Sequence, residues 1–353
     1  MPSPIRAALL GYGLAGAVFH APLIAAVDGL ELAAIVTRDP ERRDRAERDH
    51  PQATLLDSAD EVWKRAGDLE LVVIATPNSS HVPLAEAAID SGLAAVVDKP
   101  LAATAADGRG LVRAARDRGV MLTVFQNRRW DGDFLTVREL LASEGAGGLG
   151  EVLRFESRYE RWRPQPTGGW RESDDPAAAG GLLYDLGSHL VDQALVLFGP
   201  ARTVYAELDR RRPDAETDDD TFVAMTHASG VRSHVWMSVL AAQPGPRFRL
   251  LGRDAAYVKY GLDVQEEALH AGRWPDDPSW GQEPEERWGL LGSAADVRAV
   301  PTRPGAYHRL YEGVVASLRE GKPPPVDPDE VISALEVLEA AKASASEGRV
   351  IGL

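Results

Sequence analysis

Gly11-Tyr12-Gly13-Leu14-Ala15-Gly16 is the stretch that decides the fold, and it stands close to the N-terminus. It follows a short apolar run, Ile5 to Leu10, and precedes a segment typical of a helix, Leu14 to Val27. In a strand-turn-helix unit the first glycine permits a sharp turn, the second lets the backbone approach phosphate, and the third lets helix and strand pack closely. The free N–H groups of the helix start then bind an anion. The pattern predicts a dinucleotide-binding turn, with an ordinary glycine turn as the alternative.

The length and composition narrow the class of protein. At 353 residues the chain exceeds one typical core, so two domains are expected. A net charge of −15 argues against a nucleic-acid surface, which needs clustered Lys and Arg. The chain contains no cysteine, which excludes disulfides, thiolate metal ligands and cysteine nucleophiles. A reducing cytoplasm fits this composition.

One uncharged segment resembles a membrane span only in length. Residues 7–27 contain no Asp, Glu, Lys or Arg, but they include three glycines, His20 and Pro22, which make a poor membrane helix. The segment also leads into a regular alternation of strands and helices rather than to a cleavage site. We therefore expect a soluble, cytoplasmic protein with no membrane partner.

Apolar runs that favour buried strands alternate with helical segments up to about residue 124. The strand-like runs are 5–10, 31–36, 71–75, 94–97 and 121–125. The helical segments between them are 40–48, 59–65, 81–91 and 103–119. This alternation predicts an N-terminal Rossmann domain, residues 1–123, with a doubly wound parallel sheet. Ligands of such a sheet bind beyond the carboxyl ends of its strands, so the residues that follow each strand are the candidates.

Thr37, Arg38 and Asp39 follow the second strand, where an NAD-specific site usually has an acid for the ribose hydroxyls. A hydroxyl and a guanidinium suit the 2′-phosphate of NADP, because the fork of Arg matches phosphate oxygens. This pattern favours NADP, with NAD possible. In the alternative, Arg38 is a solvated loop residue and Asp39 binds the ribose.

Two further loops follow strands. Thr76-Pro77-Asn78-Ser79-Ser80-His81 comes after the third strand and is either a loop beside the nicotinamide ribose or plain turn chemistry. Asp98-Lys99-Pro100 comes after the fourth strand. Most lysines are solvated surface groups, but a lysine at a ligand-facing strand end beside a cofactor motif favours a role in chemistry.

The second half of the chain has a different pattern of apolar and polar residues. Short alternating segments at 151–160, 203–208, 221–226, 231–240, 247–252 and 255–259 predict a large, mainly antiparallel sheet. Two helices are expected near the end, at 307–320 and 329–345. We therefore expect an α+β substrate-binding and oligomerisation domain over residues 124–353. Asp218-Asp219-Asp220 is interpreted as a solvated turn rather than a metal site.

A predicted helix over residues 182–198 carries the strongest catalytic candidates of this half. Asp185 and His189 are four residues apart on one face, and Asp192 follows three later. A carboxylate one turn from an imidazole can orient it and hold its charged form, which makes a general acid/base unit. The alternative is a partly exposed structural pair. A metal site is not expected, because no third ligand has useful spacing.

A loop of Pro, Gly, Ser and Asp residues, 163–181, precedes this helix. It contains an aromatic side chain and cations that could cover a pocket. The candidate substrate or nicotinamide contacts are Asn127, Arg128, Arg163, Trp170 and Arg171.

These features together resemble the glucose–fructose oxidoreductase/inositol dehydrogenase (Gfo/Idh/MocA) family over nearly the whole chain. The resemblance rests on Gly11-x-Gly13-x-x-Gly16, on Asp98-Lys99-Pro100, which has Asp where the family motif has Glu, and on Gly180-Gly181 followed by Asp185-x-x-x-His189. Phe19-His20-Ala21-Pro22 and Gln126-Asn127-Arg128-Arg129-Trp130-Asp131 are similar to a subgroup that includes NADP-dependent scyllo-inositol dehydrogenases.

The resemblance implies reversible hydride transfer between a nicotinamide and a hydroxyl-bearing carbon of a sugar, polyol or cyclitol. It implies Lys99 and His189 as the catalytic pair with Asp185 as orienter, and a homo-oligomer, dimer or tetramer, through the C-terminal sheet. The implied cofactor contacts are Gly11, Gly13, Leu14, Ala15, Gly16, Thr37, Arg38, Thr76, Pro77, Asn78, His81, Asp98, Lys99, Pro100 and Gln126.

The residue types suit this chemistry. We expect His189 to transfer the proton and Lys99 to stabilise negative charge on the reacting oxygen, although the two roles could be exchanged. Two alternatives stay open: an NADP-binding regulator without turnover, and cofactor-assisted glycoside cleavage or elimination on the same fold.

Overall fold

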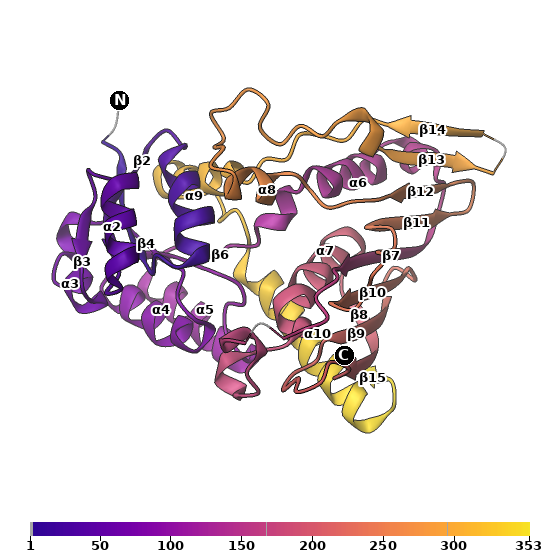
Figure 1. Ribbon diagram of the computed structural model, residues 1–353, viewed down its shortest axis with the longest axis horizontal. Helices are drawn as coiled ribbons and strands as arrows, with labels where there is room; N and C mark the ends of the chain where they lie inside the picture. Colours follow the sequence, from indigo (N-terminus) through magenta and orange to yellow (C-terminus); the bar gives the residue numbers. More distant parts are fainter. Residues whose placement is uncertain (1–2, 167, 295) are drawn as a thin grey trace. The chain divides into compact units, whose positions relative to one another are not determined.

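The protein is described by a computed structural model that covers residues 3–166, 168–294 and 296–353 (Figure 1). The chain divides into two compact units. The first unit contains Met1–Asn127, Gln265–Trp280 and Ala306–Ile332, and the second contains Arg128–Val264, Gly281–Gly305 and Ser333–Leu353. The two later segments, Gln265–Trp280 and Ala306–Ile332, fall in the first unit, although they lie within residues 124–353 of the expected linear division.

The sheet of the first unit has six parallel strands in the order β3-β2-β1-β4-β5-β6. This is the Rossmann order, which confirms the predicted fold class. The strands are β1 (Ile5–Leu10), β2 (Leu30–Val36), β3 (Thr54–Leu56), β4 (Leu71–Ile74), β5 (Ala94–Val97) and β6 (Leu122–Val124). Every residue of β4 and β5 is buried, as strands covered on both faces require. Strand β3 was not predicted, because its three residues include only one buried side chain.

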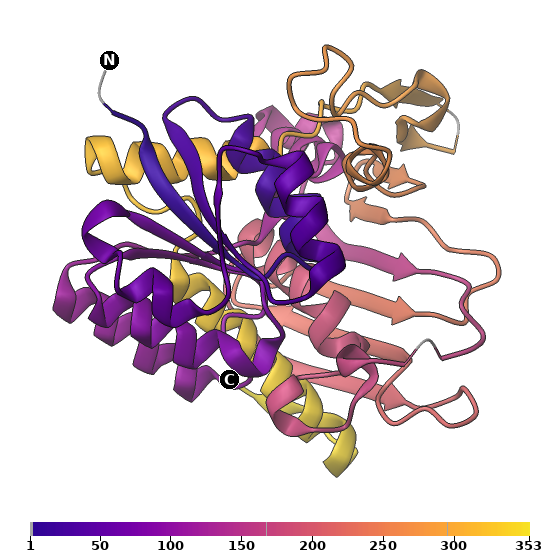
Figure 2. The same ribbon diagram turned by 60° about the vertical axis from the view of Figure 1, so that its left-hand side comes forward.

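Helices cover both faces of this sheet. Figure 2 shows α4 and α5 on one side of the strands and α9 on the other. The helices of this unit are α1 (Ala21–Ala25), α2 (Pro40–Asp49), α3 (Ala59–Trp63), α4 (His81–Asp90), α5 (Ala105–Arg118), α8 (Gln265–His270) and α9 (His308–Glu320). Short 3-10 turns lie at η2 (Ala66–Asp68) and η3 (Asn78–Ser80). Helix α9 returns to this unit because it packs against α1, and α8 packs against the π-helix η1 (Ala15–His20).

The helix after the glycine turn is less regular than predicted. Residues Ala15–His20 form a π-helix, η1, and the α-helix α1 then ends at Ala25 rather than at Val27. Short π-helical turns are rare and occur frequently at functional sites.

The second unit contains a nine-stranded sheet in the order β14-β13-β12-β11-β7-β10-β9-β8-β15. It is mainly antiparallel, as predicted, but β7 and β10 pair in parallel. The strands are β7 (Val152–Glu160), β8 (Ala201–Asp209), β9 (Asp220–His227), β10 (Arg232–Ser238), β11 (Phe248–Gly252), β12 (Ala256–Lys259), β13 (Gly289–Ser293), β14 (Asp296–Val300) and β15 (Ile351–Gly352). Strand β14 escaped prediction because four of its five residues are exposed and give no apolar alternation.

The helices of the second unit are α6 (Gly132–Ala142), the π-helix η8 (Leu183–Gly187), α7 (Ser188–Phe198) and most of α10 (Pro328–Glu347). The 3-10 turns are η4 (Asn127–Trp130), η5 (Glu144–Gly148), η6 (Trp170–Glu172), η7 (Pro176–Ala178) and η9 (Glu285–Arg287). Helix α7 packs on β7 and β10, the centre of the sheet. In the part of the chain that the structure describes, no helix is both long and apolar enough to cross a bilayer.

Candidate functional site

The glycine turn has the shape that a pyrophosphate needs. Gly11 has a φ of +93°, and a Cβ there would lie 2.6 Å from the carbonyl oxygen of Ala75. A Cβ on Gly16 would lie 2.0 Å from the carbonyl oxygen of Gly11, so helix and turn touch. Beside Gly13, by contrast, a Cβ would meet only the Arg42 guanidinium, at 3.5 Å. The backbone is thus open at the one glycine where phosphate should approach, and the turn fits a dinucleotide.

This difference between the glycines gives a sharp test. Gly13→Ala should leave the protein folded, because the new methyl group meets only a flexible side chain, yet it should weaken NADPH binding about tenfold or more by holding phosphate away from the backbone. Fluorescence titration with NADPH measures the effect, and circular dichroism checks the fold. The matched control is Gly67→Ala, because a Cβ there meets nothing within 4 Å. Unchanged NADPH binding in Gly13→Ala would contradict the assignment.

The residues after β2 surround the start of α2. Thr37 is buried and its N–H donates to the carbonyl of Leu56 at 3.1 Å, whereas Arg38 is exposed. The Asp39 carboxylate accepts from the backbone N–H of Arg42 at 3.0 Å and therefore caps α2. Capping accounts for Asp39 without a ribose, which disfavours the alternative in which Asp39 binds it. Arg42 was missed from the sequence, although its guanidinium reaches the glycine turn.

The loop after β4 is built on backbone contacts. The Ser80 hydroxyl donates to Thr76 Oγ1 at 2.7 Å, Asn78 is buried and Pro77 is exposed. His81 is the first residue of α4, and both nitrogens of its buried ring face backbone carbonyls. The loop thus has a fixed shape at the carboxyl edge of the sheet.

Asp98, Lys99 and Pro100 stand at the carboxyl end of β5, on the same edge as the glycine turn. Asp98 Oδ1 accepts the backbone N–H of Lys99 at 2.8 Å, and the Lys99–Pro100 bond is cis. Burial favours the neutral acid, but the neighbouring His20, with His81 and Lys99, leaves the pKa of Asp98 below its ordinary value. After β6, Gln126 is buried, and its N–H donates to the carbonyl of Val124 at 2.8 Å.

A buried pair of side chains, His20 and Tyr311, lies near Asp98 and was not predicted from the sequence. The His20 ring lies 3.9 Å from Asp98 through Nε2 and 2.6 Å from the Tyr311 hydroxyl through Nδ1. Burial, followed by the charge of Asp98, raises the pKa of Tyr311 well above its ordinary value, so its hydroxyl stays protonated. Tyr311 comes from α9, which no local pattern links to β5.

The helix that carries Asp185 and His189 begins in a tight backbone arrangement. Gly181 has a φ of +93°, and a Cβ there would lie 2.0 Å from Asp218 Oδ1. The Asp218 carboxylate accepts from the N–H of Leu183 at 2.8 Å and from the Thr221 hydroxyl at 2.6 Å. Asp218 therefore fixes the start of the helix that positions the candidate acid/base unit.

These contacts correct the interpretation of 218–220 as a solvated turn. Asp219 is fully buried, and it accepts from the backbone N–H groups of Arg211 and Arg212, at 2.7 and 2.9 Å, and from Arg212 Nε at 3.0 Å. Burial raises the pKa of Asp218 in spite of its hydrogen bonds. The three successive acids looked solvated because the sequence does not show that Leu183 and the buried Arg212 lie beside them in the fold.

Asp185 and His189 differ in exposure. His189 is 5% exposed, whereas the Asp185 side chain is 32% exposed and lies 3.7 Å from Arg171 Nε. The predicted helix over 182–198 is a π-helix through Gly187 and an α-helix from Ser188 onward. A cation beside the carboxylate favours its ionised form, which an imidazole orienter requires.

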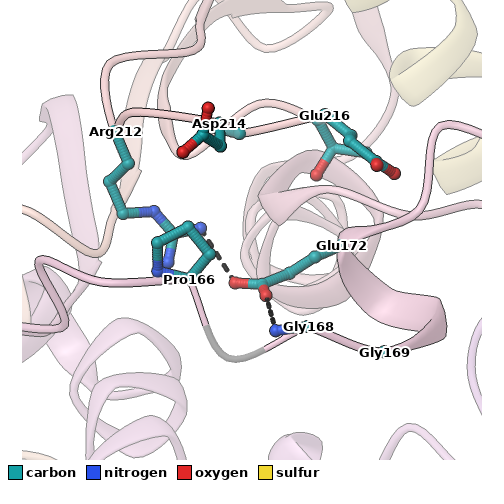
Figure 3. A pocket seen from close by; sticks show the side chains of 9 residues that line it. Pro166, Gly168, Gly169, Glu172, Arg212, Asp214 and Glu216 are labelled. Carbon is teal, nitrogen blue, oxygen red and sulfur yellow. Dashed lines mark hydrogen bonds and ion pairs between the residues drawn. The ribbon is translucent and has the colours of Figure 1, made fainter.

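The loop 163–181 is anchored by one arginine. Arg212 is buried and donates to Glu172 Oε1 at 2.9 Å, while Glu172 Oε2 accepts the N–H of Gly168 at 2.5 Å (Figure 3). These groups line a cavity of about 150 Å³, with Asp214 and Glu216 on its other wall. Arg171 is exposed next to this anchor.

The other substrate candidates have different surroundings. Arg163 is exposed and its N–H donates to the carbonyl of Val239 at 2.7 Å. The side chain of Trp170 lies outside the part of the chain that the structure describes. Asn127 is buried, and the buried Arg128 lies 3.6 Å from Asp131 with its guanidinium 4.7 Å from the centroid of the Tyr159 ring. These contacts give Arg128 a packing role within the second unit.

Asp192, which shares the helix face of His189, belongs to a buried ion pair. It accepts from Arg129 Nε at 2.8 Å and Nη2 at 2.6 Å, and Asp192 is 2% exposed. The next residue, Gln193, donates to the carbonyl of Arg128 at 2.9 Å and accepts from Arg247 at 2.8 Å. This polar network fixes the rotation of α7 and therefore the direction of His189. Among the described residues no group of three or more His, Asp or Glu side chains could hold a metal ion.

Comparison with known proteins gives a consistent result. The model of the NAD-binding Rossmann fold of the Gfo/Idh/MocA oxidoreductases matches residues 5–126, and the model of the C-terminal alpha/beta domain matches residues 145–353. The NADP(+)-dependent scyllo-inositol 2-dehydrogenase IolW of Bacillus subtilis is 37% identical, over 99% of this chain and 96% of the relative. A D-apiose dehydrogenase of Paraburkholderia graminis is 30% identical, over 93% of this chain and 84% of the relative. The solved structure of the Bacillus subtilis oxidoreductase YvaA has a TM-score of 0.92, with 37% identity and 99% coverage of both chains.

Proposed function

Because this chain belongs to the Gfo/Idh/MocA oxidoreductase family, we propose that it transfers hydride between NADP and a hydroxyl-bearing carbon of a cyclitol, polyol or sugar. The observation that carries the proposal is Lys99 at the carboxyl end of β5, beside a glycine turn that is open at Gly13. One edge of the sheet thus provides both the binding site for the cofactor and the charged group for the reacting oxygen.

The proposed mechanism uses His189, Asp185 and Lys99. The nicotinamide supplies the acceptor or donor of the hydride when it is bound. His189 takes the hydroxyl proton in the oxidative direction and returns it in the reductive direction, with Asp185 orienting the imidazole. Lys99 donates to the reacting oxygen and stabilises its negative charge. The low exposure of His189, 5%, supports this role because a water-poor site strengthens such interactions.

A substrate panel tests the reaction class. Purified protein is mixed with inositols, acyclic polyols and aldoses, each with NADP+ and with NAD+, while absorbance of the reduced nicotinamide is recorded. We expect reduction with at least one cyclitol or sugar and faster turnover with NADP+. Product formation without net nicotinamide reduction would favour glycoside cleavage or elimination, and cofactor binding without any product would favour a regulator.

The proposed preference for NADP rests on Thr37, Arg38 and Arg42. Asp39 caps α2 and so does not present the acid that NAD sites use, and one relative of this chain, IolW, is named for NADP(+). A guanidinium that binds the 2′-phosphate contributes a charge-assisted hydrogen bond.

Removing the positive charge of Arg38 should change which cofactor the protein prefers. Arg38→Ala should weaken NADPH binding about tenfold to a hundredfold, the loss of a hydrogen bond to a charged group, and should leave NADH binding unchanged. Parallel titrations with both cofactors measure the ratio. Arg48→Ala is the control, because Arg48 is exposed near the end of α2, the helix that follows Arg38. An equal loss for NADPH and NADH would contradict a contact with the 2′-phosphate.

We extend the proposal to assembly and location. Phe222 and Trp236 lie half-buried on neighbouring strands of the nine-stranded sheet, with ring centroids 5.1 Å apart. This aromatic surface supports a homo-oligomer, a dimer or tetramer, through the sheet, and sedimentation analysis tests it. We also propose that the protein is located in the cytoplasm.

A further inference from the structure

His81 has hydrogen-bond partners that set it apart from another buried histidine of the chain. Its Nδ1 lies 2.8 Å from the carbonyl oxygen of Pro100, and its Nε2 lies 2.9 Å from the carbonyl oxygen of Thr76. The residue is 1% exposed. Carbonyl oxygens only accept hydrogen bonds, so each ring nitrogen must carry a proton to satisfy its partner.

The comparison with His227 shows why this is unusual. The ring of His227 lies 2.7 Å from the carbonyl oxygen of Gly199 and 2.7 Å from the Ser233 hydroxyl. A hydroxyl can donate, so a neutral ring with one N–H satisfies both contacts of His227. Burial lowers the pKa of His227, in keeping with a neutral ring. A neutral His81, in contrast, would direct a lone pair at a carbonyl oxygen.

We infer that His81 is held as an imidazolium and that this cation is a positioning residue, which clamps together the two loops that follow β4 and β5. One loop carries Thr76 and Asn78, and the other carries Lys99 and Pro100. The inference rests on the proposed function, because these loops are the candidate sites for nicotinamide and catalysis. Both ring nitrogens bind the protein itself, so His81 acts through the loops rather than by touching the cofactor.

The charges around His81 support this state. A cation at the first residue of α4 is unfavourable by the helix dipole, so it requires a nearby negative charge. Asp98 supplies it: the carboxylate interacts with the charges of His81, His20 and Lys99, and Tyr311 faces His20 from α9. Asp98, whose side chain is 15% exposed, is thus the carboxylate that interacts with the clamp.

The clamp predicts that NADPH binding depends on pH. As pH rises and the ring loses one proton, one of the two loops loses its hydrogen bond and the remaining lone pair repels a carbonyl oxygen. NADPH binding should therefore weaken by about tenfold with rising pH, the effect of a lost hydrogen bond to a charged group. In His81→Gln both donors lie on a single amide nitrogen, so the side chain cannot place an N–H at each of the two ring-nitrogen positions. Binding should therefore be weak already at low pH and should not change further through this step.

Nitrogen-15 NMR of the histidine rings tests the inference directly on the cofactor-free full chain, with the His81 signals assigned by their loss in His81→Gln. We expect two protonated ring nitrogens for His81 near neutral pH and one for His227. A bare nitrogen on His81 would overturn the inference. NADPH titrations from pH about 6 to about 9 follow, with His227→Gln as the matched control that should retain the wild-type pH profile. An identical profile in His81→Gln and wild type would also overturn it, whereas failure of the wild type to bind NADPH at every pH would contradict the proposed function instead.

Discussion

Replacing His189 by alanine should lower turnover by about 10²- to 10⁴-fold, the contribution of a positioned acid/base group. NADPH binding should change little, because the candidate cofactor contacts of the glycine turn belong to the other unit of the chain. Steady-state turnover and NADPH titration on the same sample separate these quantities. Lys99→Ala should lose turnover on the same scale, since it removes the group that stabilises charge on the reacting oxygen.

The control must remove a histidine that has no part in the chemistry. His308→Ala is suitable, because the His308 side chain is 25% exposed on α9 and lies 3.9 Å from Glu312 of the same helix. Its turnover should stay close to that of the wild type. Normal turnover in both His189→Ala and Lys99→Ala would show that neither residue takes part in the reaction.

The second large effect concerns the helix that holds His189. Asp192→Asn should lower the free energy of unfolding by about 3–5 kcal/mol, because it leaves the Arg129 guanidinium buried without its counter-charge. Both side chains are under one tenth exposed, and two hydrogen bonds join them. Urea titration followed by circular dichroism measures the loss. Turnover should fall as well, since α7 then loses the contact that fixes its rotation.

Two variants distinguish a buried charge from a general disturbance of the chain. The double variant Arg129→Met with Asp192→Leu should recover most of the lost stability, because no charge is left buried. Glu151→Gln should change stability little, because its partner Arg253 and Glu151 itself are both more than 60% exposed. Equal losses in Asp192→Asn and Glu151→Gln would contradict a special role for the buried pair.

The elements that the sequence predicts well are those set by local pattern. The glycine turn, β4 and β5 follow from glycine spacing and continuous apolar runs, and the structure has them within one residue of the predicted ends. Lys99 was selected as a candidate for the same reason, because a parallel strand presents its next residues at the ligand edge.

The missed features depend on contacts between distant segments. Tyr311 reaches His20 across 291 residues, and Asp218 caps a helix that begins 35 residues earlier. Arg42 approaches Gly13 only because Asp39 starts α2 at that place. The acids at 218–220 looked like a solvated turn, since composition alone does not reveal the buried Arg212 that pairs with Asp219. Such partners become visible only when the sheet orders are known.

The measurement that tests hydride transfer most directly follows one hydrogen atom. A cyclitol or sugar that the panel identifies as a substrate is prepared with deuterium on the reacting carbon and is oxidised with NADP+ in ordinary water. We expect mass spectrometry to find the deuterium in the reduced nicotinamide, and His189→Ala to lower the rate of this transfer. Deuterium released to water, or a product formed while the nicotinamide stays unlabelled and oxidised, would contradict this expectation.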